Sequence, residues 1–159
     1  MRRADTSSIT SDSATQEYSK VKMKKINVWT AGLIALVVSV VANAILIAIF
    51  LPLTGVPANV MTFKVAGPTG FFTVLGVLGA LVVFTIVRRF SARPNHVFVW
   101  IAALVLLVSF LPDIFVHDLG PMFAQITVGG AVLLMAMHVA CAAITVSALT
   151  LLTKAPASR

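Results

Sequence analysis

Residues 31–50 read AGLIALVVSVVANAILIAIF, and this stretch contains no charged side chain. A bilayer core about 30 Å thick needs about 20 helical residues at a rise of about 1.5 Å each, so the stretch is long enough to cross it. A cleaved signal peptide is the alternative, because lysines precede the stretch and residues 42–44 (Ala-Asn-Ala) have the form of a cleavage site. The apolar run continues to Phe50, beyond the length of a signal core, which favours an uncleaved span.

Three further apolar runs follow, and charged or helix-breaking residues separate them. The runs are continuously apolar, whereas the strands of a membrane barrel alternate. The predicted fold class is therefore an all-α integral membrane protein with four transmembrane helices in an up-down-up-down bundle. The expected spans are about 28–51, 71–89, 96–115 and 123–152.

The two ends of the chain, outside these spans, are polar. A disordered, basic N-terminal tail is expected over 1–25, a membrane domain over 26–153, and a short tail over 154–159. The connection 53–69 contains two prolines and two glycines, which break helices. It is still fairly apolar, so a short hairpin and a segment lying against the membrane surface both remain open.

The composition excludes most other classes of protein. Hydrophobic residues make up 59% of the 159 residues, charged residues only 11%, and the mean hydropathy is +1.02. A soluble domain of this size could not bury so much apolar surface behind so few charges. A disulfide-stapled module is also excluded, because Cys141 is the only cysteine.

The basic residues predict an orientation rather than a nucleic-acid site. The net charge of +7 comes from residues that flank the apolar runs, so specific nucleic-acid binding is not expected. With the N-terminus inside, eleven Lys and Arg residues lie on the inner side and Lys64 alone lies outside. The positive-inside rule then predicts that both termini are cytoplasmic.

Three polar residues within the spans are candidates for function: Asn43, Ser109 and His138. Asn43 and His138 lie at depths that differ by about one helical turn, so a hydrogen bond between them is expected to be within reach. Such a bond would hold helices together. The functional alternatives for His138 are a proton relay, a haem ligand or a metal ligand.

A second polar group lies at the outer end of the third span, in the sequence PDIFVHD. It contains Asp113, His117 and Asp118, and Asp113 and His117 share a helix face at a spacing of four residues. Two carboxylates and an imidazole are ligands for a divalent cation such as zinc. The alternative is a polar loop that marks the water interface.

Small residues four apart predict close helix packing in the second and fourth spans. The second span has Gly76, Gly79 and Ala80, and the fourth has Ala136 and Ala140. The expected neighbour is another helix of the same chain or of a second copy.

Several of these features together resemble a family of small four-span bacterial membrane proteins of unknown function. They are Asn43 in the first span, Arg93-Pro94 before the third, Ser109 and Pro112 near its end, and Met137-His138 in the fourth. The resemblance covers about residues 28–152. It implies the architecture and a bacterial inner membrane, and it carries no activity.

No assembled catalytic set, metal motif or phosphate-binding loop is present in the sequence, and no cofactor is expected. The leading hypothesis is a non-enzymatic structural or partner-binding membrane subunit. Its expected partners are the lipid bilayer and either a second copy or another membrane protein. The alternatives are a small oligomeric transporter or proton-coupled carrier that uses His138 and Asn43, and a membrane redox or haem protein.

Overall fold

The structure, a computed structural model, describes residues 26–57, 60–64, 67–115 and 124–153. These residues contain two short 3-10 turns and no strand. The long helices are α2 (Val28–Phe50), α3 (Pro68–Phe90), α4 (Pro94–Ile114) and α5 (Val128–Leu151), and the turns are η1 (Leu51–Leu53) and η2 (Met61–Phe63). The tails predicted over 1–25 and 154–159 lie outside the described residues.

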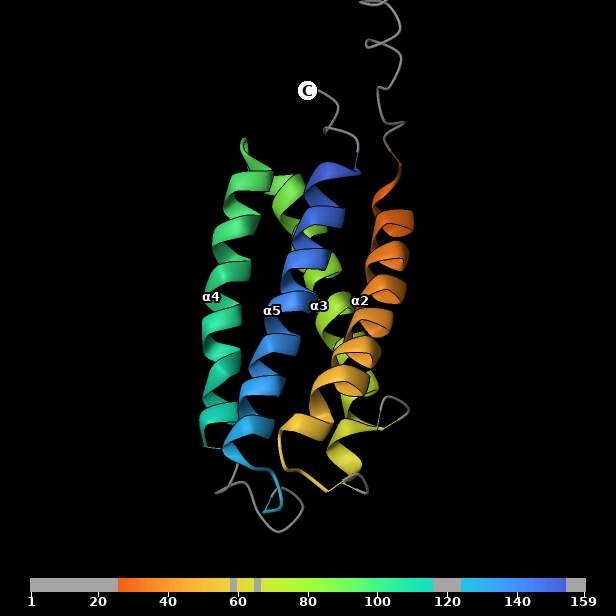
Figure 1. Cartoon of the computed structure of the whole chain (residues 1–159). Helices are drawn as coiled ribbons and strands as arrows, with labels where there is room; N and C mark the ends of the chain where they lie inside the picture. The colour runs from red at the N-terminus through yellow and green to blue at the C-terminus, as the bar shows by residue number, and fades with distance from the viewer. Residues whose placement is uncertain (1–25, 58–59, 65–66, 116–123, 154–159) are drawn as a thin grey trace, which may run out of the picture.

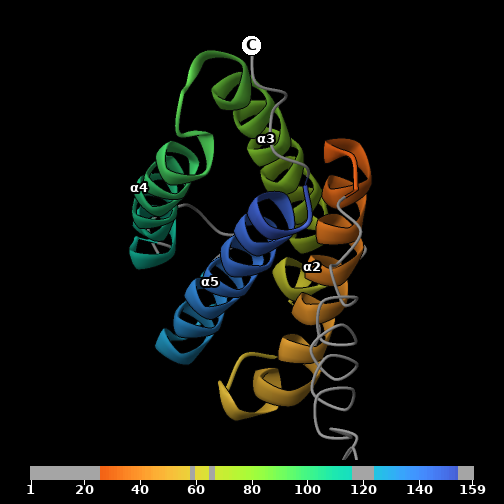
Figure 2. The same cartoon turned by 90° about the horizontal axis from the view of Figure 1, so that it is seen from above.

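The four helices run alternately up and down and form one bundle (Figure 1). Seen along the bundle, α2, α3, α4 and α5 stand in order around a centre, and α5 closes the circle against α2 (Figure 2). Each helix is long and apolar enough to cross a membrane. The predicted all-α bundle of four membrane-spanning helices is confirmed.

Local sequence signals set the helix ends. Pro68 and Pro94 occupy the first turns of α3 and α4, where a missing N–H costs little. The fourth helix was expected from residue 123, but residues 124–127 are not helical. The side chain of Thr127 accepts a hydrogen bond from the Gly130 N–H at 3.1 Å, so this threonine caps α5 and the helix begins at Val128.

The interior of the bundle is lined by a stripe of small residues on α2. Ala31, Ala35 and Ser39 recur every four residues and are 0% exposed. Ala35 packs with Val77 of α3 and Ala148 of α5. Small side chains at this spacing allow helices to approach closely, and here they bring α2 against two neighbours at once.

The small residues that the sequence singled out lie elsewhere. A Cβ atom added at Gly76 or Gly79 would meet nothing within 4 Å, and Ala136 is exposed. Ala80 and Ala140 are only partly buried. The expectation that Gly76 and Gly79 pack closely on a helix of the same chain is therefore wrong, and contact with a second copy stays a prediction.

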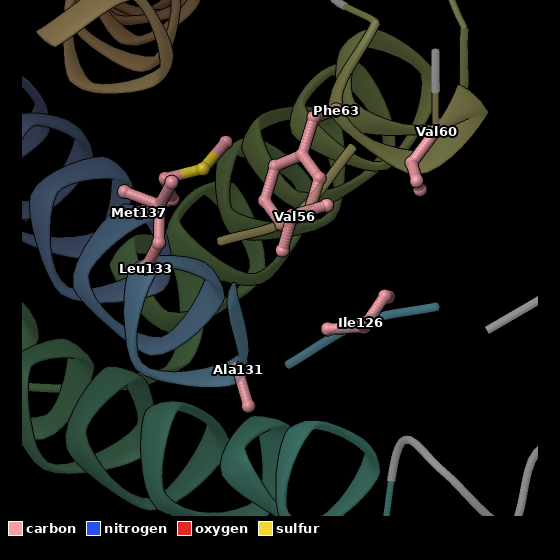
Figure 3. Close-up of a cluster of buried hydrophobic side chains, with 7 residues drawn as sticks. All are labelled: Val56, Val60, Phe63, Ile126, Ala131, Leu133 and Met137. Carbon is pink, nitrogen blue, oxygen red and sulfur yellow. The ribbon is translucent and has the colours of Figure 1, made fainter. Parts of the chain in front are cut away.

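The connection between α2 and α3 packs onto the start of α5. Val56, Val60 and Phe63 of this connection form an apolar cluster with Ile126, which precedes α5 (Figure 3). The α5 members of the cluster are Ala131, Leu133 and Met137.

A side chain at Gly130 would not fit this contact, because its Cβ would lie 2.7 Å from Val56 Cγ2. The described part of the connection thus covers one end of the bundle and forms no hairpin.

A residue shortly before α2 and the residue after α5 meet at the end of the bundle opposite this connection. The Ile26 N–H donates to the Leu152 carbonyl at 2.9 Å. Arg88, Arg89 and Arg93 lie at this same end, since α3 ends and α4 begins there. Lys64 lies at the other end, in the connection between α2 and α3.

Candidate functional site

Two ionisable side chains, a buried aspartate and a partly exposed histidine, meet between α4 and α5. Asp113, in the last turn of α4, is only 6% exposed. His138, in the middle of α5, directs its Nδ1 to within 3.0 Å of Asp113 Oδ2. Ionisable residues within membrane helices are costly, so a buried carboxylate beside an imidazole marks a candidate functional site.

The surroundings of His138 determine which ring nitrogen carries a proton. Nδ1 also lies 3.0 Å from the carbonyl oxygen of Leu134 in the preceding turn. A carbonyl and a carboxylate both accept hydrogen bonds, so Nδ1 must be the donor. The Leu134 carbonyl oxygen and Asp113 Oδ2 both lie 3.0 Å from Nδ1, so both accept from this single N–H. In the neutral imidazole Nε2 is then an acceptor.

Asn43 is held by α3 and not by His138. Its Nδ2 donates to Thr73 Oγ1 at 2.9 Å, and the Thr73 hydroxyl donates to the Thr69 carbonyl at 2.7 Å. The predicted hydrogen bond between Asn43 and His138 is therefore wrong. The Asn43 side chain is 3% exposed, and within the described part of the chain its Oδ1 has no partner.

Asn43 and His138 nevertheless face one cavity. Its volume is about 730 Å³, and it lies between α3, α4 and α5. Binding pockets for small molecules commonly measure about 300–1,000 Å³. The polar residues that line the cavity are Asn43, Thr62, Thr69, Thr73, Ser109, Asp113, His138, Cys141 and Thr145.

The cavity is polar at one end and apolar at the other. Thr69 and Thr73 begin α3, and Asp113 ends α4, so these groups share the end of the bundle that contains Lys64. Toward the opposite end the lining is apolar, with Val83, Phe98 and Ile101. Thr145 is the main exception in this second half.

The rim of the cavity is exposed on two helices. Phe72, Leu75 and Gly79 on α3 line the cavity and are exposed, and so is Val105 on α4. These residues lie within the two membrane-spanning helices. The cavity therefore opens sideways, between α3 and α4, at a level where the surroundings of the protein are lipid.

The metal site predicted at the end of the third span stays a prediction, because two of its three residues are not described. Asp113 turns inward to His138, and His117 and Asp118 lie outside the described residues. No group of three potential metal ligands occurs in the described ranges. Ser109 lines the cavity, and its hydroxyl donates to the Leu106 carbonyl of its own helix at 2.7 Å.

Four antiparallel apolar helices around a laterally open cavity define a multi-pass membrane protein. Residues 24–154 match the family of unknown function DUF6069, and the chain belongs to this family. The match covers all four helices, which confirms the resemblance to a family of unknown function noted in the sequence. No curated protein and no solved structure matches the chain.

Proposed function

We propose that the protein is a non-enzymatic membrane subunit that binds a small molecule in the cavity between α3, α4 and α5. The observation that carries the proposal is the buried Asp113 beside His138 at the wall of a cavity of about 730 Å³. If Asp113 and His138 served only to join α4 to α5, no cavity would be needed beside them. The unpartnered Oδ1 of Asn43 in the same wall supports a ligand that supplies the missing hydrogen bond.

The first test is whether the cavity holds a small molecule. We expect native mass spectrometry of the mildly extracted protein to show a bound species with a mass typical of a membrane-soluble compound. Gly79→Leu should reduce the bound fraction about tenfold, because the added side chain enters a wall that now has nothing within 4 Å of the Cβ position. Ala136→Leu is the matched control, since Ala136 is exposed and lies outside the cavity. Equal binding by both variants would contradict the proposal.

A second candidate function is docking of a partner helix in the same groove, in keeping with a structural or partner-binding subunit. Gly76 and Gly79 favour it, because their exposed backbone would let another helix approach closely. Crosslinking in membranes separates the two functions. A crosslink from Gly79→Cys to a second copy or another protein favours docking, whereas capture of small molecules alone favours the binding cavity. Vectorial release of the ligand across liposomes would make the protein a carrier.

We further propose that the protein resides in the inner membrane of a bacterium with both termini in the cytoplasm. The basic residues support this orientation, because Arg88, Arg89 and Arg93 lie at the end of the bundle where Ile26 and Leu152 meet. In a Cys141→Ser background, Lys64→Cys should react with an impermeant maleimide in intact cells, and Ala92→Cys should react only after permeabilisation. The reverse pattern would invert the proposed topology.

A further inference from the structure

We infer that the ligand of the cavity is a single-chain amphiphile whose head group donates hydrogen bonds, as a hydroxyl or an amine does. This inference rests on the proposed binding function and adds the chemistry and the orientation of the ligand. The head would lie at Asp113, His138 and Asn43, and the chain would run between α3 and α4 toward Phe98.

The polar end of the cavity is rich in hydrogen-bond acceptors. Asn43 Oδ1 is buried and lacks a hydrogen-bond partner among the described residues, and the Asp113 carboxylate has lone pairs besides the one that faces His138 Nδ1. His138 Nε2 is a third acceptor in the neutral ring, because Nδ1 carries the proton. One of the two N–H groups of the Asn43 amide is already bound to Thr73. A ligand satisfies this end by donating hydrogen bonds rather than by accepting them.

The charges around the cavity disfavour an anionic head group. No Lys or Arg occurs among the described residues that line the cavity, and Asp113 is the acidic group in that lining. A phosphate or carboxylate would meet a carboxylate in a medium that screens charge poorly. An amine would form a charge-assisted hydrogen bond with Asp113, and a hydroxyl would form a neutral one.

The apolar part of the cavity suits an extended chain. Phe98 and Asp113 are about 22 Å apart along α4, at a rise of about 1.5 Å per residue. Between them the wall is formed by apolar and small residues, including Gly79, Ala102 and Val105. The opening between α3 and α4 lets a chain enter directly from the bilayer, where such amphiphiles are dissolved.

The test compares head groups on one alkyl chain. Purified protein in detergent is mixed with equal mole fractions of tetradecanol, tetradecylamine, tetradecanoate and tetradecyl phosphate, and bound adducts are counted by native mass spectrometry. We expect the alcohol and the amine to bind at least about tenfold better than the two anions. Asp113→Asn keeps the size of the side chain and should lower amine binding about tenfold, with a smaller effect on the alcohol. Thr85→Val, on the exposed face of α3 outside the cavity, is the control that should bind as the unaltered protein does.

Each outcome is decisive. Equal binding of all four compounds, abolished by Gly79→Leu, would overturn the head-group inference and leave the binding cavity in place. Preference for the anions would overturn the inference in the same way. Absence of binding by every compound, together with no co-purified small molecule, would overturn both the inference and the proposed function.

Discussion

Replacing His138 with leucine is expected to lower the free energy of unfolding by about 3 kcal/mol. The substitution removes the imidazole 3.0 Å from Asp113 Oδ2 and leaves that carboxylate only 6% exposed within a membrane helix. An isolated buried charge is costly because neither lipid nor apolar side chains solvate it. Unfolding in mixed micelles, followed by far-ultraviolet circular dichroism during a titration with sodium dodecyl sulfate, measures the loss.

The matched variant replaces both partners. Asp113→Leu combined with His138→Leu should regain most of the lost stability, because the double variant leaves no buried carboxylate without its partner. If the double variant is no more stable than His138→Leu alone, the two residues are not coupled. Loss of amine binding in the double variant, despite regained stability, would separate the role of the pair in binding from its role in folding.

Replacing Ala35 with leucine should have an effect of similar size, about 3 kcal/mol. Ala35 is 0% exposed and lies between Val77 of α3 and Ala148 of α5. The added isopropyl group has no space there, so it would force α2 away from both neighbours. The same titration should show an earlier unfolding transition.

Ala48→Leu is the control for this prediction. It places the same substitution on the same helix at an exposed position, and it should leave the transition within about 0.5 kcal/mol of the unaltered protein. Equal effects at both positions would mean that helix propensity or insertion, and not packing of α2, determines the change.

The sequence predicts the class of fold because the bilayer imposes it. The sequence has four charge-poor runs long enough to cross the bilayer. In each of them a helix satisfies the backbone hydrogen bonds that lipid cannot supply. The helix ends are less predictable from hydropathy alone. The apolar run containing Phe123 suggested an early start for the fourth helix, whereas capping by Thr127 places the start at Val128.

The sequence predicts the polar participants of the site but not their pairing. Depth along the helices places Asn43 near His138. However, α2 contacts both α3 and α5, and its rotation about its axis turns Asn43 toward Thr73 of α3. Spacing along α4 suggested Asp113 with His117, but the interior face of α4 directs Asp113 toward α5. Rotation about a helix axis is weakly encoded in segments that are apolar on every side.

The sequence does contain one signal for the rotation of α2 about its axis. The recurrence of Ala31, Ala35, Ser39 and Asn43 every four residues marks the interior face of α2. The glycines of the second span were predicted to mark a packing face, but they line the cavity.

The contact of the first long helix with the last has a consequence for biosynthesis. α2 makes its most extensive contact with α5, and Ile26 is bonded to Leu152. A ribosome delivers the amino-terminal segment first, so the side of α2 that packs on Ala148 of α5 stays uncovered until the last segment is inserted. Closing this long-range contact completes the bundle. A chain truncated before α5 would leave that side of α2 without its main partner.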